Sequence, residues 1–212
     1  MRYVALLRGI NVGKGARVPM KTLKALLEGL GLSNVVTYLN SGNVVFDSAL
    51  GTSELTQLIA DELERTFGET IPTLVKTSAE MIAIEASIPS EWGSNATEQT
   101  YVAYLFDDVD RPSLVAELPI KRQFMSISYT PGAIVWNIKR ENYNRSQITK
   151  IAGHSSYARM TTRNINTPGS WPHYPRRPDG PSRRSPCASR GPGERYPSVS
   201  TGRRSYATTS SQ

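Results

Sequence analysis

Short apolar runs alternate with longer amphipathic stretches through the first part of the chain. The short runs are rich in β-branched and aromatic residues and are bounded by glycine or polar turns, which is typical of strands. The longer stretches repeat apolar residues at helical spacing, one after Pro19 and the other after Ser53, and both residue types favour helix starts. The predicted elements are a strand at residues 3–7, a helix at 19–30, strands at 35–39 and 44–46, a helix at 53–67 and a strand at 71–75.

The next part of the chain repeats this alternation with weaker signals. Its predicted elements are a helix at residues 78–87, a strand at 101–106, a helix at 112–118, a hairpin of 125–129 and 133–138, and a helix at 145–151. The first half has the order β-α-β-β-α-β of the ferredoxin-like fold, and the second half gives β-α-β-β-α. We therefore predict an α+β fold of two ferredoxin-like βαββαβ-type subdomains in tandem, residues 1–77 and 78–167.

The last 45 residues have a different composition, with 8 Pro, 9 Ser, 5 Gly and 8 Arg. Such a segment cannot bury enough apolar surface to offset its chain entropy, so residues 168–212 are predicted to be a disordered tail. The tail carries most of the net charge of +7, because residues 1–167 hold 17 basic and 16 acidic side chains. The overall basicity therefore does not indicate nucleic-acid binding by the body, although the tail is basic enough for non-specific binding.

Residues that bind metals or act as nucleophiles are scarce. The single cysteine, Cys187, lies in the tail, and the body has one histidine, His154. This inventory excludes a disulfide scaffold, a Cys/His zinc site and a Cys–His catalytic pair from the body, and we predict no metal and no cofactor. The N-terminal apolar run is too short for a signal peptide and no stretch has membrane-spanning length, so we expect a cytoplasmic protein without a membrane partner.

Four motifs in the body resemble those of one bacterial family. They are LLRGINVG at residues 6–13, VPM at 18–20, YLNSGNVVF at 38–46 and TTRNINT at 161–167. In this order and spacing they are similar to the domain of unknown function 1697 family. The resemblance implies an α+β fold of two ferredoxin-like subdomains, and it implies no activity.

The chain departs from the family pattern after Thr167. In the family, the Arg-Asn-x-Asn-Thr segment resembles the lead-in to an aliphatic helix, whereas residues 168–172 of this chain are PGSWP. Proline and glycine at these positions oppose a helix. We interpret the tail either as a translated frameshift of a GC-rich gene, because Arg, Pro, Ser and Gly dominate such reading frames, or as a genuine basic extension.

The glycine-rich loop at residues 9–17 is the main candidate for a ligand site. We expect it between a strand and a helix, where backbone N–H groups and basic neighbours can hold a small anionic or polar ligand. It is not a P-loop, because Gly15 replaces the Ser or Thr that binds magnesium, and it lacks the G-x-G-x-x-G pattern. The alternative is a bend that glycine permits, with its asparagine bonded to neighbouring loops. The candidate ligand-binding residues are Arg8, Asn11, Gly13, Lys14 and Arg17.

A second set of polar side chains is a candidate cluster. The Ser-Gly-Asn turn at residues 41–43 needs no ligand to explain it, and we expect it at the sheet end opposite the glycine-rich loop, which argues against one shared site. Around residue 163 the Asn and Thr side chains suit a helix cap or a loop network, and the arginine there could hold a phosphate or carboxylate. The cluster consists of Asn40, Ser41, Asn43, Arg163, Asn164 and Asn166.

Two further motifs are better explained by structure than by chemistry. Asp107, Asp108 and Asp110 could bind a divalent cation, but they suit the first turn of the next helix. His154 could act as a general acid or base, but no carboxylate is placed to orient it, and a surface or helix-end histidine is favoured. The catalytic residues are therefore unknown.

The favoured function is a module that binds a small anionic or polar ligand with the loop at residues 9–17. The alternatives are an enzyme of unknown class and a nucleic-acid-binding protein. Nucleic-acid binding would use aromatic side chains on the strands to stack on bases, but the near-neutral body lacks the expected charge. These aromatic residues are Tyr3, Tyr38, Phe46, Tyr101, Tyr104, Phe106 and Trp136.

Overall fold

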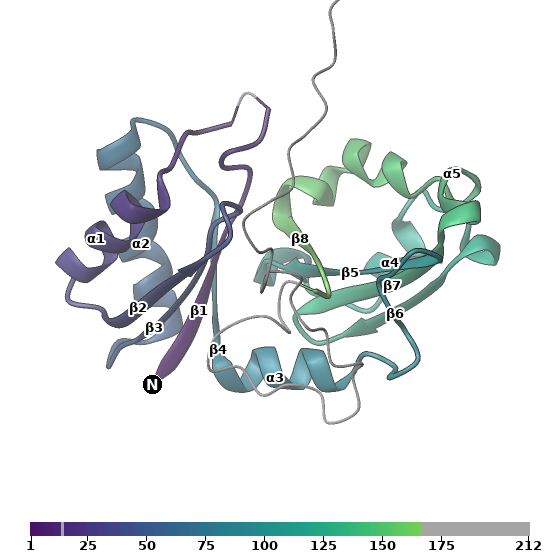
Figure 1. Ribbon diagram of the computed structural model, residues 1–212, viewed down its shortest axis with the longest axis horizontal. Helices are drawn as coiled ribbons and strands as arrows, with labels where there is room; N and C mark the ends of the chain where they lie inside the picture. The colour runs from purple at the N-terminus through teal and green to yellow at the C-terminus, as the bar shows by residue number, and fades with distance from the viewer. Residues whose placement is uncertain (14, 167–212) are drawn as a thin grey trace, which may run out of the picture. The chain divides into compact units, whose positions relative to one another are not determined.

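Residues 1–13 and 15–166, as described by a computed structural model, form an α+β fold with two four-stranded antiparallel sheets and helices (Figure 1). All of them belong to one structural unit. Lys14 and the chain from residue 167 lie outside the described residues. The predictions for the tail, disorder and a possible frameshift, concern this undescribed part.

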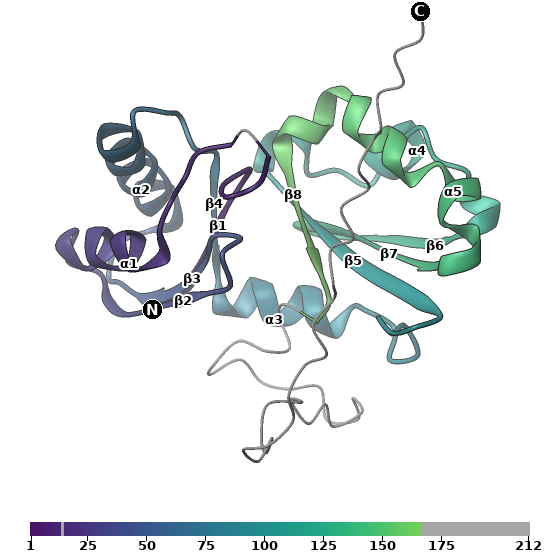
Figure 2. The ribbon, with the colours of Figure 1, turned by 45° about the horizontal axis from the view of Figure 1, so that its top comes forward.

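The first sheet has the strand order β2-β3-β1-β4. Its elements are β1 (Arg2–Leu7), α1 (Met20–Gly29), β2 (Ser33–Tyr38), β3 (Asn43–Asp47), α2 (Thr52–Phe67) and β4 (Thr73–Thr77). Helices α1 and α2 lie on the same face of this sheet (Figures 1 and 2). All six predicted elements are confirmed with small shifts at their ends; α2, for example, has Gly51 as its N-cap and begins before Ser53.

The second sheet has the strand order β6-β7-β5-β8, so the two sheets arrange their first to fourth strands in the same order. The strands are β5 (Glu98–Leu105), β6 (Ser126–Thr130), β7 (Ala133–Lys139) and β8 (Met160–Asn164). The α-helices of the second half are α3 (Ser78–Ala86), α4 (Leu114–Glu117) and α5 (Tyr143–Ser146), and all but α3 are short. Helix α3 follows β4 directly and contacts β1 and β4 of the first sheet.

Two predictions for the second half are wrong. The predicted helix at residues 145–151 is interrupted, because Gln147 has a positive φ of 56° and the chain continues as a 3-10 helix at Ile148–Gly153. Strand β8 has no counterpart among the predicted elements, because its mostly polar sequence favours a helix cap or a loop network. Pairing with β5, from Leu105↔Met160 to Tyr101↔Asn164, holds this segment extended.

Strand β1 is buried on both faces, which explains its continuous apolar sequence. Tyr3, Ala5 and Leu7 belong to a core with α1 and α2, whereas Val4 and Leu6 belong to a second core. That second core also contains residues of α3, β5 and β7. The two sheets therefore share apolar packing, and the subdomain boundary after residue 77 remains a prediction.

Burial of the aromatic side chains weakens the nucleic-acid alternative. Bases stack only on aromatic rings that solvent can reach. Five of the seven aromatic candidates are buried, and Tyr38 and Tyr101 are partly buried against the cores. The buried ones are Tyr3, Phe46, Tyr104, Phe106 and Trp136. The sheets therefore do not offer these rings as a stacking platform.

Candidate functional site

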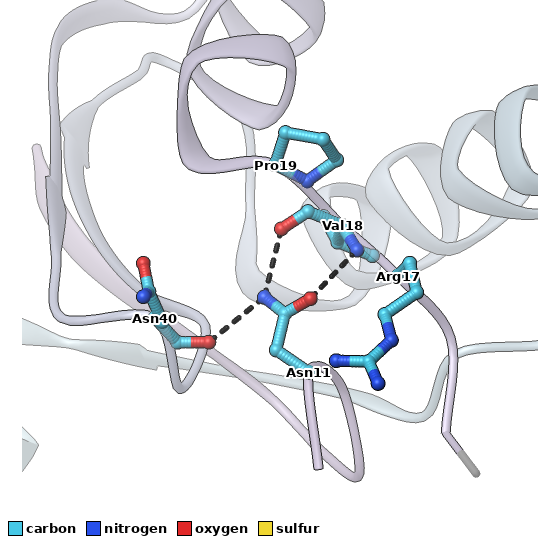
Figure 3. A pocket seen from close by; sticks show the side chains of 5 residues that line it. All are labelled: Asn11, Arg17, Val18, Pro19 and Asn40. Carbon is cyan, nitrogen blue, oxygen red and sulfur yellow. Dashed lines mark hydrogen bonds between the residues drawn. The ribbon is translucent and has the colours of Figure 1, made fainter. Parts of the chain in front are cut away.

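A hollow of about 350 Å³ lies where β1 leads into α1 (Figure 3). Asn11 and Arg17 line it from the glycine-rich loop, and Asn40 lines it from the turn between β2 and β3. Val18 and Pro19 line it where the loop leads into α1, of which Pro19 is the N-cap. Of the candidate ligand-binding residues, Asn11 and Arg17 are thus at the hollow. The sequence prediction does not include Val18 and Pro19, although both belong to the VPM motif.

The glycine-rich loop and the β2–β3 turn lie at the same end of the first sheet, and the expectation of opposite ends is wrong. Strands β1 and β2 are both antiparallel to β3, so they run in the same direction and end at the same edge. The Leu7 backbone N–H donates to Gly42 O at 2.8 Å. A Cβ on Gly42, whose φ is +72°, would lie 2.6 Å from Leu7 Cβ, so this close approach requires glycine.

Asn11 bonds the glycine-rich loop to Val18 and Asn40, two other residues that line the hollow (Figure 3). Its side-chain Nδ2 donates to Val18 O at 2.8 Å and to Asn40 O at 2.9 Å, and its Oδ1 accepts from the Val18 N–H at 2.9 Å. Its φ of 55° is in the left-handed region that asparagine tolerates. Asn11 therefore makes the contacts expected of a bend whose asparagine bonds to neighbouring loops. Its side-chain polar atoms shape the hollow and are already hydrogen-bonded to protein groups.

The backbone of the loop also closes on itself. The Asn11 N–H donates to Ala16 O and the Gly15 N–H donates to Val12 O, both at 2.9 Å. A Cβ on Gly15 would lie 1.9 Å from Gly9 O, so the two ends of the loop can approach this closely only with glycine at residue 15. Two N–H groups that a phosphate cradle would need are thus used within the loop. Gly13 is exposed and does not line the hollow.

Arg17 differs from its neighbours because its guanidinium is exposed and unpaired within residues 1–13 and 15–166. Its guanidinium gives the hollow a positive charge. Helix α1 adds to it, because its N-terminus has no side-chain cap and no acidic residue in the first turn. An anion in the hollow would meet favourable charge from both sources.

Arg8 lies elsewhere. Its Nε donates to Met160 O at 3.0 Å, and its Cζ lies 5.0 Å from the centroid of the Tyr157 ring. These contacts join the end of β1 to the segment that enters β8. Arg8 does not line the hollow.

Arg163 is the centre of a buried junction between β8 and the first sheet, with 9% of its surface exposed. Its acceptors are Asn43 Oδ1 at 2.6 Å from Nε, Thr161 Oγ1 and Thr162 O at 2.8 and 3.0 Å from Nη1, and Leu7 O and Ser41 O at 2.9 Å from Nη2. These bonds use all five N–H groups of the guanidinium. Burial lowers the pKa of Arg163 to about 10, so the group stays protonated at neutral pH. It keeps no N–H for a phosphate or carboxylate.

The second candidate cluster is therefore divided among three places. Asn40 lines the hollow, whereas Ser41 and Asn43 belong to the Arg163 junction, where Asn43 Nδ2 also donates to Ser41 Oγ at 2.9 Å. Asn164 and Asn166 lie at Ser94 instead: Asn164 Nδ2 donates to Ser94 Oγ at 2.7 Å and Asn166 Nδ2 to Ser94 O at 3.5 Å.

Two of the three aspartates after β5 have separate protein partners. Asp108 pairs with Arg159 at 2.9 Å, and Asp110 accepts from the Gly132 N–H at 2.8 Å. Within the described part of the chain, no group of three or more His, Cys, Asp or Glu side chains could hold a metal ion. In the same residues, no helix is both long and apolar enough to cross a membrane.

His154 is at a helix end, as the sequence favours. Its Nδ1 accepts from the Ser156 backbone N–H at 3.2 Å and caps the 3-10 helix at Ser155–Arg159. This contact gives the side chain a structural role and adds no support for an enzymatic one.

Comparisons with known proteins match this fold. The solved structure of the conserved bacterial protein SP0830 from Streptococcus pneumoniae aligns with a TM-score of 0.68 and 24% sequence identity, covering 78% of this chain and 93% of that one. At this identity the likeness shows a shared fold. No curated protein matches the chain. The family model described as protein of unknown function (DUF1697) matches residues 1–136. Since that match spans more than half of the sequence, the chain belongs to the DUF1697 family.

Proposed function

We propose that the protein binds a small anion in the hollow between the glycine-rich loop and the β2–β3 turn. Arg17 carries this proposal, because its exposed guanidinium lines the hollow and has no partner within residues 1–13 and 15–166. The uncapped N-terminus of α1 beside Pro19 adds the favourable end of a helix dipole. The planar fork of arginine suits phosphate or carboxylate oxygens.

The other polar groups at the hollow give it shape and not charge. Asn11 is bonded to Val18 and Asn40, so these residues fix the position of the walls before a ligand arrives. A preformed site avoids part of the entropy cost of ordering loops on binding. The proposal thus assigns charge recognition to Arg17 and preorganisation to Asn11.

Calorimetric titration of the full chain with inorganic phosphate at low salt tests the proposal. We expect saturable binding that Arg17→Ala weakens at least about tenfold, the loss expected for one charge-assisted contact. Arg111→Ala is the control: it removes one partly exposed arginine, paired with Glu117 at 2.6 Å, and it should leave phosphate binding unchanged. Equal binding by the wild type and Arg17→Ala would refute the proposal.

We also propose that each sheet with its helices is a ferredoxin-like subdomain, with the division after residue 77. The shared strand order of the two sheets supports this reading. A cytoplasmic location is proposed with it, on the basis of the sequence.

A further inference from the structure

We infer that a positively charged surface in the second half of the chain binds single-stranded nucleic acid. The surface is formed by the segment around the 3-10 helix at Arg122–Phe124, by α5 and by the 3-10 helix at Ile148–Gly153. We call it the cationic surface, and its basic side chains, all of them exposed, are Lys121, Arg122, Arg145 and Lys150. None of them lines the hollow at Arg17, so the inference goes beyond the proposed function.

The charges of the body are divided unevenly along the sequence. Residues 1–117 contain 9 basic and 15 acidic side chains, whereas residues 118–166 contain 8 basic side chains and 1 acidic one, Glu141. The near-neutral total of the body therefore hides a strongly basic second part. Because salt screens charges beyond about 8 Å at physiological ionic strength, a polyanion responds to the local charge of a surface more than to the total charge.

Backbone and side-chain contacts bring the basic segments together. The Lys121 N–H donates to Ser146 O at 2.8 Å, so the segment that starts at Lys121 adjoins the end of α5. The Cζ of Arg145 lies 4.3 Å from the centroid of the Phe124 ring, which joins the same two segments through their side chains. Lys150 follows in the 3-10 helix that contacts α5. The four cations therefore belong to one surface.

Carboxylates do not neutralise the cationic surface within the part of the chain that the structure describes. The ion pairs found there involve other basic side chains. Glu117, which precedes the surface in the sequence, is paired with Arg111 at 2.6 Å. An anionic partner can thus supply counter-charge that the described residues do not provide.

The contact between Arg145 and Phe124 favours nucleic acid over other polyanions. The guanidinium lies over the ring, and Arg145 is nevertheless exposed, so a base can reach the side that faces away from Phe124. Guanidinium planes stack on aromatic rings and on unstacked bases. A single strand offers such bases together with phosphates for the lysines, whereas a duplex keeps its bases stacked. This surface differs from the sheet aromatic residues, most of which are buried.

Fluorescence anisotropy of a labelled oligothymidylate with the full chain, over a series of salt concentrations, tests the inference. Lys121→Glu combined with Arg145→Glu should weaken binding at least about tenfold at low salt. The slope of the logarithm of the binding constant against the logarithm of the salt concentration should fall in magnitude by about 1.4, because two phosphate contacts are lost.

Lys24→Glu combined with Arg65→Glu is the matched control. It also reverses one exposed lysine and one exposed arginine and changes the net charge equally, but its residues are in α1 and α2. We expect it to leave binding of the oligonucleotide unchanged. Thermal unfolding of both double variants verifies that they are folded.

Arg145→Lys separates stacking from charge. Lysine keeps the positive charge but lacks the planar group, so binding of the oligonucleotide should weaken at least about fivefold, the loss expected for one stacked base. Binding of inorganic polyphosphate, which has no bases, should stay unchanged. An equal response of the two ligands to Arg145→Lys would make the surface a general polyanion site and overturn the assignment to nucleic acid.

Two further outcomes would overturn the inference. Equal weakening by the two double variants, or no oligonucleotide binding at low salt, would show that the cationic surface does not bind the strand. Sedimentation with phosphatidylserine vesicles that requires Lys121 and Arg145, without oligonucleotide binding, would assign the surface to a membrane. A tenfold loss confined to the variants of the cationic surface would support the inference.

Discussion

Two arginines lie beside the same turn between β2 and β3 and have opposite environments. Arg163 is buried and donates all five N–H groups to protein oxygens, one of them Ser41 O. Arg17 is exposed at the hollow that Asn40 lines, and it has no partner within the described chain. The residue type supplies a positive charge in both places, but the number of free donors decides whether that charge stabilises the fold or is available to a ligand.

The largest expected effect comes from Arg163. Replacing it by alanine leaves Leu7 O, Ser41 O and Asn43 Oδ1 without their donor and opens a cavity, so we expect a loss of about 3–5 kcal/mol in the free energy of unfolding. Urea denaturation measures this loss. Arg163→Lys should restore little of it, because an ammonium has three donors and cannot reproduce the planar fork. A loss below about 1 kcal/mol would remove the contrast between the two arginines.

Substitution of Gly42 tests whether close packing holds the β2–β3 turn in place between the hollow and the Arg163 junction. Gly42→Ala would place a Cβ 2.6 Å from Leu7 Cβ and 2.7 Å from Ile10 Cδ1 in a left-handed conformation, and we expect a loss of about 2–3 kcal/mol. Gly31→Ala is the control, because its φ is +81° but its Cβ would meet nothing within 4 Å, so backbone strain alone should cost about 1 kcal/mol. Equal losses in thermal or urea unfolding would show that close packing against Leu7 and Ile10 is unimportant.

A third arginine extends the comparison to a carboxylate partner. Arg2 donates to both oxygens of Asp47 at 2.9 and 3.0 Å, and this bond, with a second from Asn34, lowers the pKa of Asp47 to about 2. Because the pKa is depressed in the folded state, the stabilisation is present above the ordinary pKa of about 3.9 and is lost as the pH falls through about 2.

Asp47→Asn should therefore lower stability by no more than about 1 kcal/mol at pH 7, since the pair is partly exposed. Urea unfolding at a series of pH values should show the difference between variant and wild type shrinking as the pH falls from 4 to 2. A difference that is constant over this range would mean that the carboxylate charge adds nothing to the pair.

The smallest expected effect on stability belongs to Arg17. Arg17→Ala removes a side chain without a bonded partner in the described residues, so the free energy of unfolding should change by less than about 0.5 kcal/mol. The same variant should bind phosphate at least about tenfold more weakly. A large loss of stability would instead place Arg17 with Arg163 among the residues that hold the fold together.

The sequence is most informative about the fold where hydrophobic periodicity is strong. All six elements of the first half follow from runs such as residues 3–7 and the leucines of α1. Strand β8 does not, because its five residues are mostly polar and its extended form depends on pairing with β5, which lies far away in the sequence. Gln147 likewise interrupts a predicted helix by taking a positive φ that local propensity does not indicate.

For the candidate site, the sequence identifies residue types but not their partners. Arg163 and Arg17 both have a side chain that can bind an anion, and only the structure shows that all five N–H groups of Arg163 already donate to protein oxygens. Arginine is rarely buried in proteins, so the sequence around Arg163 gives no reason to expect a buried guanidinium there. Asn11 and Asn40 meet because β1 and β2 run in the same direction, and the predicted β-α-β order is itself compatible with that direction.

The hydrogen bonds by which Arg8 and Arg163 join the two sheets end largely on backbone carbonyls, namely Met160 O, Leu7 O and Ser41 O. Every amino acid presents the same carbonyl, so replacing the side chain at residue 41 or 160 would not delete the acceptor. The donors, the guanidinium groups of Arg8 and Arg163, cannot be replaced in this way, because a shorter or non-planar cation does not reproduce the planar guanidinium geometry. In a lineage accumulating mutations, this junction would therefore tolerate drift at its acceptor positions while the two arginines stayed fixed.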